Sequence, residues 1–339
     1  MNTIVARALS VLSMSSLVAM AALTACGASG PGQAEGPKPS LEDPKDNGGG
    51  GAPASSPDLD AAMSALESKD YKTARAKAEA VLAKTPDSAD ANFVLGVCDE
   101  SDGKPDDAVK HYQAALAKDP AISGASINLS ALLIDLKRWD DAAQVCKDGL
   151  AKQKGTVELH INLSYALKGK GDHESAAKSF ANAIALKPDD PTLRVDRAME
   201  LLSAGDKDGA AKELKNALGK SGGNADLLAE IGVGLAQTGD APGCVAAFDK
   251  AIAAKSTPEF FTERAICKHK ANDLAGARKD LDDALAKDPA NIKAHAAAAK
   301  YAEEAKDKKA CKLHYLEVAK LAKEGDLADQ AKKGADRCK

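Results

Sequence analysis

The tetrapeptide Ile-Asn-Leu-Ser occurs at residues 127–130 and again at residues 161–164, so that this stretch of the chain recurs after a fixed interval. Prolines mark the same interval, because Pro120 follows Pro86 by one interval and Pro188 lies two intervals further on. Similar segments end in proline at four places, namely Val-Leu-Ala-Lys-Thr-Pro86, Ala-Leu-Ala-Lys-Asp-Pro120, Ile-Ala-Leu-Lys-Pro188 and Ala-Leu-Ala-Lys-Asp-Pro289. A fixed period of about 34 residues predicts a stack of repeated supersecondary units.

Small and bulky residues recur at fixed places within this period, and the pattern resembles the tetratricopeptide repeat, a helix–turn–helix unit. Small residues stand at its eighth position in successive units: Gly96, Ser130, Ser164, Ala198, Gly232 and Ala265. Alanine dominates its twentieth position, and bulky residues such as Tyr112, Phe180 and Phe248 occupy the twenty-fourth. Small side chains let two antiparallel helices approach closely, and bulky side chains fill the space beside them.

The span 58–339 holds 282 residues, which correspond to about 8.3 periods. The resemblance therefore implies an all-α fold, a right-handed superhelical solenoid of about eight helix pairs with a C-terminal capping helix near residues 321–337. Gly-Asp pairs at 171–172, 205–206 and 239–240 are expected in the turns within pairs, because glycine suits a left-handed C-cap and aspartate an N-cap. The tryptophan usual at the fourth position of the repeat is missing from every unit.

Residues 1–25 have the features of an export signal. A positive residue, Arg7, precedes an apolar segment at 8–23 that is shorter than the roughly 20 residues of a membrane-spanning helix. The segment leads into Leu-Thr-Ala-Cys at 23–26, which resembles the bacterial lipobox. The resemblance implies that residues 1–25 are removed and that Cys26 becomes a lipid-modified N-terminus, whose several acyl chains give stable anchoring. An ordinary secretory signal is the alternative.

Residues 26–57 connect the expected anchor to the repeats. Residues 27–57 contain 8 glycines and 6 prolines and no periodic apolar face, so nothing offsets the entropy of ordering them. They are predicted to form a disordered tether with a reach of roughly 30 Å. Gly27 follows the cysteine, and the sorting rules of such lipoproteins retain those with aspartate there in the inner membrane. The expected location is therefore the outer membrane, on the lipid anchor alone and facing the periplasm.

The family resemblance also implies a binding surface. In the family, the first helix of each pair lines a concave groove through positions 2, 5, 9 and 12, and some members add position 6. Here these positions give a largely apolar strip that suits an amphipathic helix or an extended peptide: Phe93, Val97, Ile127, Asn128, Ile134, Ile161, Asn162, Tyr165, Val195 and Met199. The alternative is that these side chains pack structurally between neighbouring helices.

Two features of the strip concern the chemistry of a peptide ligand. Asn128 and Asn162 can each donate to and accept from a peptide backbone, as in family members that use an asparagine ladder at the sixth position. In later units the sixth position becomes acidic, with Asp196, Glu230 and Glu263. The second half of the groove is therefore expected to prefer a basic segment.

Six cysteines remain once Cys26 is set aside. An even number in an exported chain permits three disulfides with 15 pairings. Two pairs on neighbouring helices of the expected stack are candidate disulfides, Cys244 with Cys267 and Cys311 with Cys338. Cys98 and Cys146 lie on helices that are not immediate neighbours, and we do not expect them to pair. The alternative is that all six are small core residues.

Composition and motifs exclude several classes of function. The net charge is −4 and no basic stripe is present, which argues against nucleic-acid binding. Aromatic residues make up only 3%, too few for base-stacking platforms. The sequence contains no zinc-protease, phosphate-loop or haem-attachment motif, and Cys311 with His314 is too small a set for a metal site. We therefore expect no cofactor, no metal and no enzyme activity.

Together these observations predict a lipid-anchored scaffold or adaptor that binds another cell-envelope protein or peptide in its groove. By resemblance to bacterial tetratricopeptide lipoproteins, pilotin-like assistance in assembling an outer-membrane machine is one concrete form. Two other functions stay open. One is an enzyme with a site between helices, which repeat arrays rarely build. The other is a passive spacer without a specific ligand.

Overall fold

The computed structural model describes residues 56–153 and 155–338. These residues form 17 α-helices and no strand, which confirms the predicted all-α fold of repeated helix pairs. They divide into two compact units, with the boundary after Pro188. The predicted export signal and Cys26, with all but the end of the predicted tether, lie outside the described residues.

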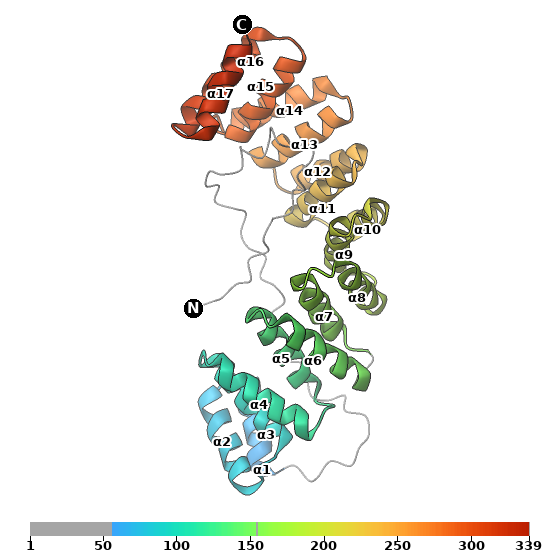
Figure 1. The fold of residues 1–339 in the computed structure, drawn as a ribbon, viewed down its shortest axis with the longest axis vertical. Helices are drawn as coiled ribbons and strands as arrows, with labels where there is room; N and C mark the ends of the chain where they lie inside the picture. Colours follow the sequence, from blue (N-terminus) through green and yellow to red (C-terminus); the bar gives the residue numbers. More distant parts are fainter. Residues whose placement is uncertain (1–55, 154, 339) are drawn as a thin grey trace. The chain divides into compact units, whose positions relative to one another are not determined.

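The first unit, residues 56–188, contains four helix pairs (Figure 1). They are α1 (Pro57–Glu67) with α2 (Tyr71–Lys84), α3 (Ala89–Ser101) with α4 (Pro105–Lys118), α5 (Ser123–Asp135) with α6 (Trp139–Lys152), and α7 (Val157–Gly169) with α8 (His173–Leu186). The two helices of each pair contact each other, and the first helices α1, α3, α5 and α7 also contact one another in order. The first helices therefore form one continuous layer of this unit.

The second unit, residues 189–338, contains four more pairs and a closing helix. They are α9 (Pro191–Ser203) with α10 (Lys207–Lys220), α11 (Ala225–Thr238) with α12 (Ala241–Ala254), α13 (Pro258–Lys270) with α14 (Leu274–Lys287), α15 (Ile292–Glu304) with α16 (Lys308–Ala322), and finally α17 (Asp326–Arg337). The first helices α9, α11, α13 and α15 again contact one another in order. Eight pairs and a C-terminal helix are the number that the repeat period predicts.

The turns within the pairs follow the predicted chemistry. Three glycines lie in the left-handed region that favours this residue: Gly171 with φ 77°, Gly205 with φ 87° and Gly239 with φ 91°. The aspartate after each glycine caps the next helix by accepting from the backbone N–H three residues further along: Asp172, Asp206 and Asp240. Because such a cap satisfies a donor that the helix leaves free, each turn fixes where the second helix begins.

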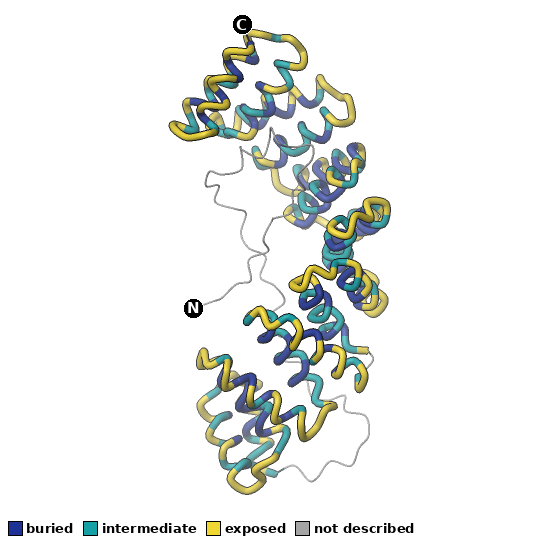
Figure 2. The backbone as a smooth tube through the Cα atoms, viewed as in Figure 1, coloured by how far each residue is buried: buried dark blue, intermediate teal, exposed yellow. Residues whose placement is uncertain are grey.

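Small residues packed against large rings hold the pairs together. A Cβ atom on Gly96 of α3 would lie 2.5 Å from the ring of Tyr112 on α4, closer than carbon atoms can pack. Gly232 of α11 has the same relation to the ring of Phe248 on α12, at 2.7 Å. Buried residues follow the helix sides that face neighbouring helices, and the turns are exposed (Figure 2). The eighth and twenty-fourth positions of the repeat therefore meet, as the predicted packing requires.

We expect Gly96→Ala to destabilise the first unit by about 1–3 kcal/mol, because the new methyl group would overlap the fully buried ring of Tyr112. The matched control is Gly219→Ala in the last turn of α10, where a Cβ atom would meet nothing within 4 Å. This control should stabilise by about 0.5 kcal/mol, since alanine loses less backbone entropy on folding. Urea denaturation followed by circular dichroism measures both, and equal effects would contradict the close contact.

Candidate binding surface

Six large apolar residues lie on the layer of first helices in the first unit, and we name the surface that they form the unit-one face. They are Phe93 and Val97 on α3, Ile127 and Ile134 on α5, and Ile161 and Tyr165 on α7. A spacing of four or seven residues places the two members of each pair on one side of their helix. All six are partly exposed. The unit-one face is therefore an apolar strip that solvent reaches.

The two aromatic rings of the unit-one face are held in place from the side. The Phe93 ring centroid lies 6.1 Å from that of Tyr112. Phe93 also fits closely over Gly124 of α5, where a Cβ atom would come within 2.9 Å of the ring. Tyr165 meets Phe180 edge-on, with the centroids 5.6 Å apart. Rings that are already fixed lose little further entropy when a ligand packs on them.

The two asparagines predicted to form a ladder are engaged within the protein. Asn162 donates to the carbonyl oxygen of Ile127 at 3.1 Å and to Oγ of Ser130 at 2.9 Å, so it links α7 to α5. Asn128 donates to the hydroxyl oxygen of Tyr112 at 3.3 Å. Asn162 thus uses its amide donors inside the protein, and Asn128 uses one of two, which reduces what they offer a peptide backbone.

The predicted strip continues only in part in the second unit. Val195 of α9 is fully buried, in the core cluster that also contains Leu228 and Ile231 of α11. The prediction that Val195 lines an open groove is therefore wrong, because α11 packs against α9 and encloses this side chain. Met199 is partly exposed, and its Cε atom would lie 3.3 Å from a Cβ on Gly234. Met199 thus fills the gap between two first helices as well as facing solvent.

The acidic residues expected to attract a basic ligand in the second unit are engaged. Glu263 of α13 forms an ion pair with Lys293 of α15. Asp196 and Glu230 also have partners within the protein. A carboxylate that is already paired with a cation, as Glu263 is, gains little from a further cation, so its position in the repeat does not by itself select a basic segment.

Three other carboxylates border the unit-one face, and sequence reasoning missed them. Asp90 and Glu100 lie on α3 at the two ends of the stripe that carries Phe93 and Val97, and Asp135 ends α5. Glu100 is half-buried, whereas Asp90 and Asp135 are exposed, and partial desolvation raises the pKa of all three carboxyl groups. Among the residues that the structure describes, no lysine or arginine pairs with them. The sequence could have indicated these carboxylates through their positions in the repeat, which are 2, 12 and 13.

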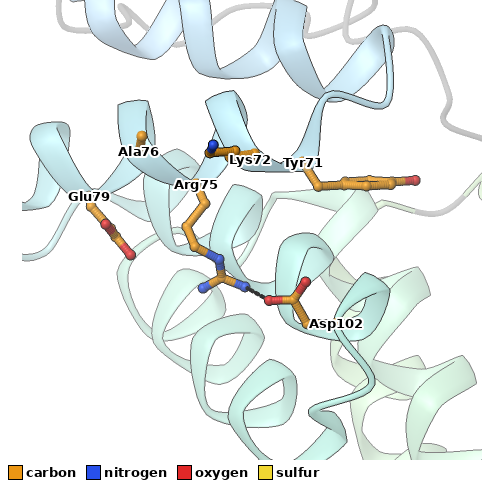
Figure 3. A pocket seen from close by; sticks show the side chains of 6 residues that line it. All are labelled: Tyr71, Lys72, Arg75, Ala76, Glu79 and Asp102. Atoms are coloured by element: carbon orange, nitrogen blue, oxygen red, sulfur yellow. Dashed lines mark hydrogen bonds and ion pairs between the residues drawn. The ribbon is translucent and has the colours of Figure 1, made fainter.

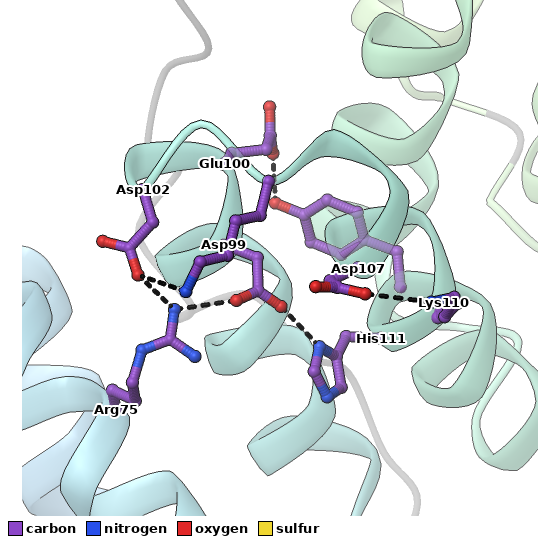
Figure 4. Close-up of polar contacts among 9 residues, drawn as sticks. Arg75, Asp99, Glu100, Asp102, Asp107, Lys110 and His111 are labelled. Atoms are coloured by element: carbon purple, nitrogen blue, oxygen red, sulfur yellow. Dashed lines mark hydrogen bonds and ion pairs between the residues drawn. The ribbon is translucent and has the colours of Figure 1, made fainter.

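A separate polar network ties α2 to α3 and α4. Asp99 of α3 is buried, and its carboxylate accepts from Arg75 of α2 at 2.8 Å and lies 2.6 Å from Nδ1 of His111 (Figure 4). Arg75 also reaches Asp102 at 2.9 Å. A surface hollow opens beside this network (Figure 3), lined by Tyr71, Lys72, Arg75, Ala76, Glu79 and Asp102. Because the Arg75 guanidinium that lines the hollow already pairs with two carboxylates, we interpret the network as a structural link between helices.

A buried carboxylate also ties α13 to α14 in the second unit. Asp280 of α14 is 1% exposed and accepts two hydrogen bonds from Arg264 of α13, at 2.8 and 2.7 Å. Lys268, one turn further along α13, lies 2.9 Å from the same carboxylate. Arg264 also pairs with Asp249 of α12 at 2.7 Å. Removing the central carboxylate would leave two poorly exposed cations side by side, which is costly.

The structure pairs the four candidate cysteines as disulfides, Cys244 with Cys267 and Cys311 with Cys338, each with Cα atoms 5.9 Å apart. The first bond ties α12 to α13, and the second ties α16 to the end of α17. Cys98 and Cys146 are separate buried thiols. Burial raises the pKa of the Cys98 thiol to about 11 and that of Cys146 to about 12, so neither is a reactive thiolate near neutral pH.

Reduction of the disulfides is expected to destabilise the second unit alone. The bonds join residues 23 and 27 positions apart, and loop entropy makes each worth about 3–4 kcal/mol. Trp139 is the single tryptophan and lies in the first unit, so its fluorescence reports on that unit. With a thiol reductant present, part of the urea unfolding transition followed by circular dichroism should shift to lower urea concentration. The unfolding transition followed by Trp139 fluorescence should keep its midpoint. If neither signal moved, the bonds would not form in the protein.

No cluster of three or more metal-ligating side chains occurs in the described part of the chain. Cys311 is taken up by its disulfide, and Nδ1 of His314 lies 3.0 Å from Nδ1 of His295. Burial, with a smaller contribution from His295, lowers the pKa of His314, which favours the neutral form of the His314 imidazole. Across residues 56–153 and 155–338, no helix is both long and apolar enough to cross a membrane.

Models of known protein families match the chain along its repeats. Family models described as tetratricopeptide repeat match residues 59–99, 99–161, 161–225 and 195–259, so that together they span more than half of the chain. No curated protein matches the chain.

Many solved structures are similar in fold at low sequence identity. PilF of Pseudomonas aeruginosa is 18% identical, with 58% of this chain and 90% of that chain covered and a TM-score of 0.48. YrrB, described as a TPR protein with an unusual peptide-binding site, is 18% identical, with 54% and 94% covered and a TM-score of 0.46. A tetratricopeptide repeat protein from Parabacteroides merdae is 13% identical, with 74% and 98% covered and a TM-score of 0.47.

The family models, the repeat period and the helix pairs agree with one another. The chain therefore belongs to the tetratricopeptide repeat family, a family of scaffolds that bind protein or peptide partners.

Proposed function

We propose that this protein is an adaptor that binds a segment of another protein on the unit-one face. The observation that carries the proposal is the strip of six large, partly exposed apolar side chains on three adjoining first helices. Contiguous apolar surface of this kind is uncommon on a soluble domain unless a ligand uses it. A strip that runs across neighbouring helices suits an amphipathic helix or an extended peptide.

We further propose that the adaptor works in the cell envelope, anchored through Cys26. The lipobox-like sequence at 23–26 supports the anchor. The pairing of four cysteines supports an oxidising compartment, because disulfides persist there and are rare in the cytosol. An adaptor on the periplasmic side of the outer membrane, pilotin-like in helping to assemble an envelope machine, is the concrete form that these features favour.

Lipid anchoring is tested by replacing the one cysteine that would carry it. Expressed in a two-membrane bacterium, the unmodified protein should fractionate with membranes, and its N-terminal peptide should have the mass of an acylated Cys26. Cys26→Ser should be neither acylated nor processed at this site, whereas Cys98→Ser, the matched control in α3, should leave acylation unchanged. A mature N-terminus without acyl groups would contradict the anchor.

Crosslinking in envelope extracts tests the adaptor function. The purified protein is mixed with extract and treated with an amine-reactive crosslinker, and the crosslinked peptides are mapped by mass spectrometry. One dominant envelope protein, crosslinked around α3, α5 and α7, is the expected result. If no partner is captured, the protein is a passive spacer. An enzyme would instead show turnover that is lost on a single polar substitution.

A further inference from the structure

We infer that the unit-one face selects a segment in which lysine or arginine residues flank the apolar anchors. The inference rests on the proposed function and adds the chemistry of the partner. Asp90, Glu100 and Asp135 stand beside the apolar strip, and the described residues supply no lysine or arginine partner to any of them. An anionic border around an apolar strip is complementary to a basic, amphipathic segment.

Glu100 and Asp135 lie near enough to act on each other across α3 and α5. Burial raises the pKa of Glu100, the hydrogen bond from Tyr112 partly offsets this rise, and the charge of Asp135 adds a smaller rise. The Glu100 carboxylate is also held in place, because it accepts a hydrogen bond from the Tyr112 hydroxyl, which itself accepts one from Asn128 at 3.3 Å. Glu100, which is held in place and partly desolvated, and the exposed Asp135 repel each other, so one cation from a ligand would stabilise both carboxylates.

Two other carboxylates on the first helices of the first unit are paired with cations, which sets Asp90, Glu100 and Asp135 apart. Glu158 of α7, which occupies the second position of its repeat as Asp90 does, lies 3.2 Å from Lys187. Asp99, on the same helix as Glu100, is held by Arg75. Asp90 is instead close to a like charge, because Asp119 adds to the rise of its pKa that burial causes. The preference for a basic segment is therefore assigned to Asp90, Glu100 and Asp135 on the unit-one face.

Peptide selection with matched variants tests the inference. The purified chain is used to select from a displayed library of random 12-residue peptides, and one selected peptide is synthesised with a fluorescent label for anisotropy titrations. We expect selected sequences to combine spaced apolar residues with lysine or arginine, and their binding to weaken as salt is raised. Asp90→Asn with Asp135→Asn should weaken binding by roughly tenfold, since each partly exposed ion pair contributes modestly.

The matched control for the charge change is Asp106→Asn with Asp148→Asn. These two exposed carboxylates lie on α4 and α6, the second helices of the same repeats, so the net charge changes equally without touching the unit-one face. Binding by the control should change by less than about twofold, the range of long-range charge effects at physiological salt. Equal weakening by both double variants would overturn the inference.

Three outcomes separate the inference from the proposed function. Neutral or acidic selected peptides, whose binding is lost when the apolar strip is changed, would overturn the inference and leave the adaptor function standing. Peptides whose binding survives loss of the apolar strip would overturn both. A face occupied by a second copy would also overturn the inference. That outcome would appear in light scattering as a molecular mass that grows with protein concentration.

Discussion

Replacing Ile161 and Tyr165 of α7 together by aspartate is expected to abolish capture of the partner while the helices stay folded. Both side chains are partly exposed on the unit-one face, so the wild-type residues can pack on a ligand. Two aspartates there would have to lose their hydration beneath an apolar ligand, which is costly without paired cations. The expected loss of affinity is on the order of hundredfold, about 3 kcal/mol. Pull-down from envelope extract and titration with a selected peptide both measure it.

The matched control places the same two charges on the other layer of the first unit. Asn182→Asp with Leu186→Asp alters two exposed positions of α8, and capture should be retained. Tyr165→Asp also removes the edge-on contact with Phe180, which contributes about 1 kcal/mol to stability. The Ile161 and Tyr165 double variant should therefore have a melting temperature a few degrees lower. Unchanged capture by the Ile161 and Tyr165 variant would remove the unit-one face as the binding surface.

Asp280→Ala is expected to destabilise the second unit by about 3 kcal/mol or more, the largest effect on stability that we predict for a single substitution. The change removes the acceptor of two hydrogen bonds from Arg264 and the counter-charge of Lys268, both of which are mostly buried. Arg264 would keep Asp249 as a partner, whereas Lys268 would lose the carboxylate with which it pairs. Urea denaturation followed by circular dichroism measures the loss.

A neighbouring carboxylate and the single tryptophan give this prediction its controls. Asp282→Ala, two residues along α14, changes an exposed carboxylate and should alter stability by less than about 0.5 kcal/mol. Fluorescence of Trp139 should show the first unit unfolding at the same urea concentration in all three proteins. If Asp280→Ala and Asp282→Ala behaved alike, the buried cluster would contribute nothing to stability.

The helix pairs could be predicted because they depend on residues close together in the sequence. The period set the number of pairs, the Gly-Asp dipeptides located turns such as that at Gly205, and small residues such as Gly96 marked where two helices touch. Each of these features acts within a single repeat. The placement of Cys244 beside Cys267 depended on the same register, because the two cysteines lie on consecutive helices.

Features that depend on how closely neighbouring repeats pack, or on which charged side chains meet between them, could not be predicted. The rule that assigned Val195 to a groove states which side of a helix a residue occupies, but not how closely the next repeat covers it. Long charged side chains find partners in the neighbouring repeat, as Lys293 does with Glu263, and a sequence does not show which carboxylates stay unpaired. Lys69 and Lys137 adopt left-handed backbone in turns that lack glycine, where the helices on either side dictate the conformation.

Site-specific photocrosslinking tests most directly whether the unit-one face binds a partner. A photoreactive phenylalanine analogue replaces Tyr165 on the unit-one face or, in the control, the exposed Lys178 on α8, and the full chain is irradiated in cells. We predict one dominant protein adduct from position 165 and none from position 178. Equal labelling from both positions, or an adduct from position 178 alone, would contradict the account.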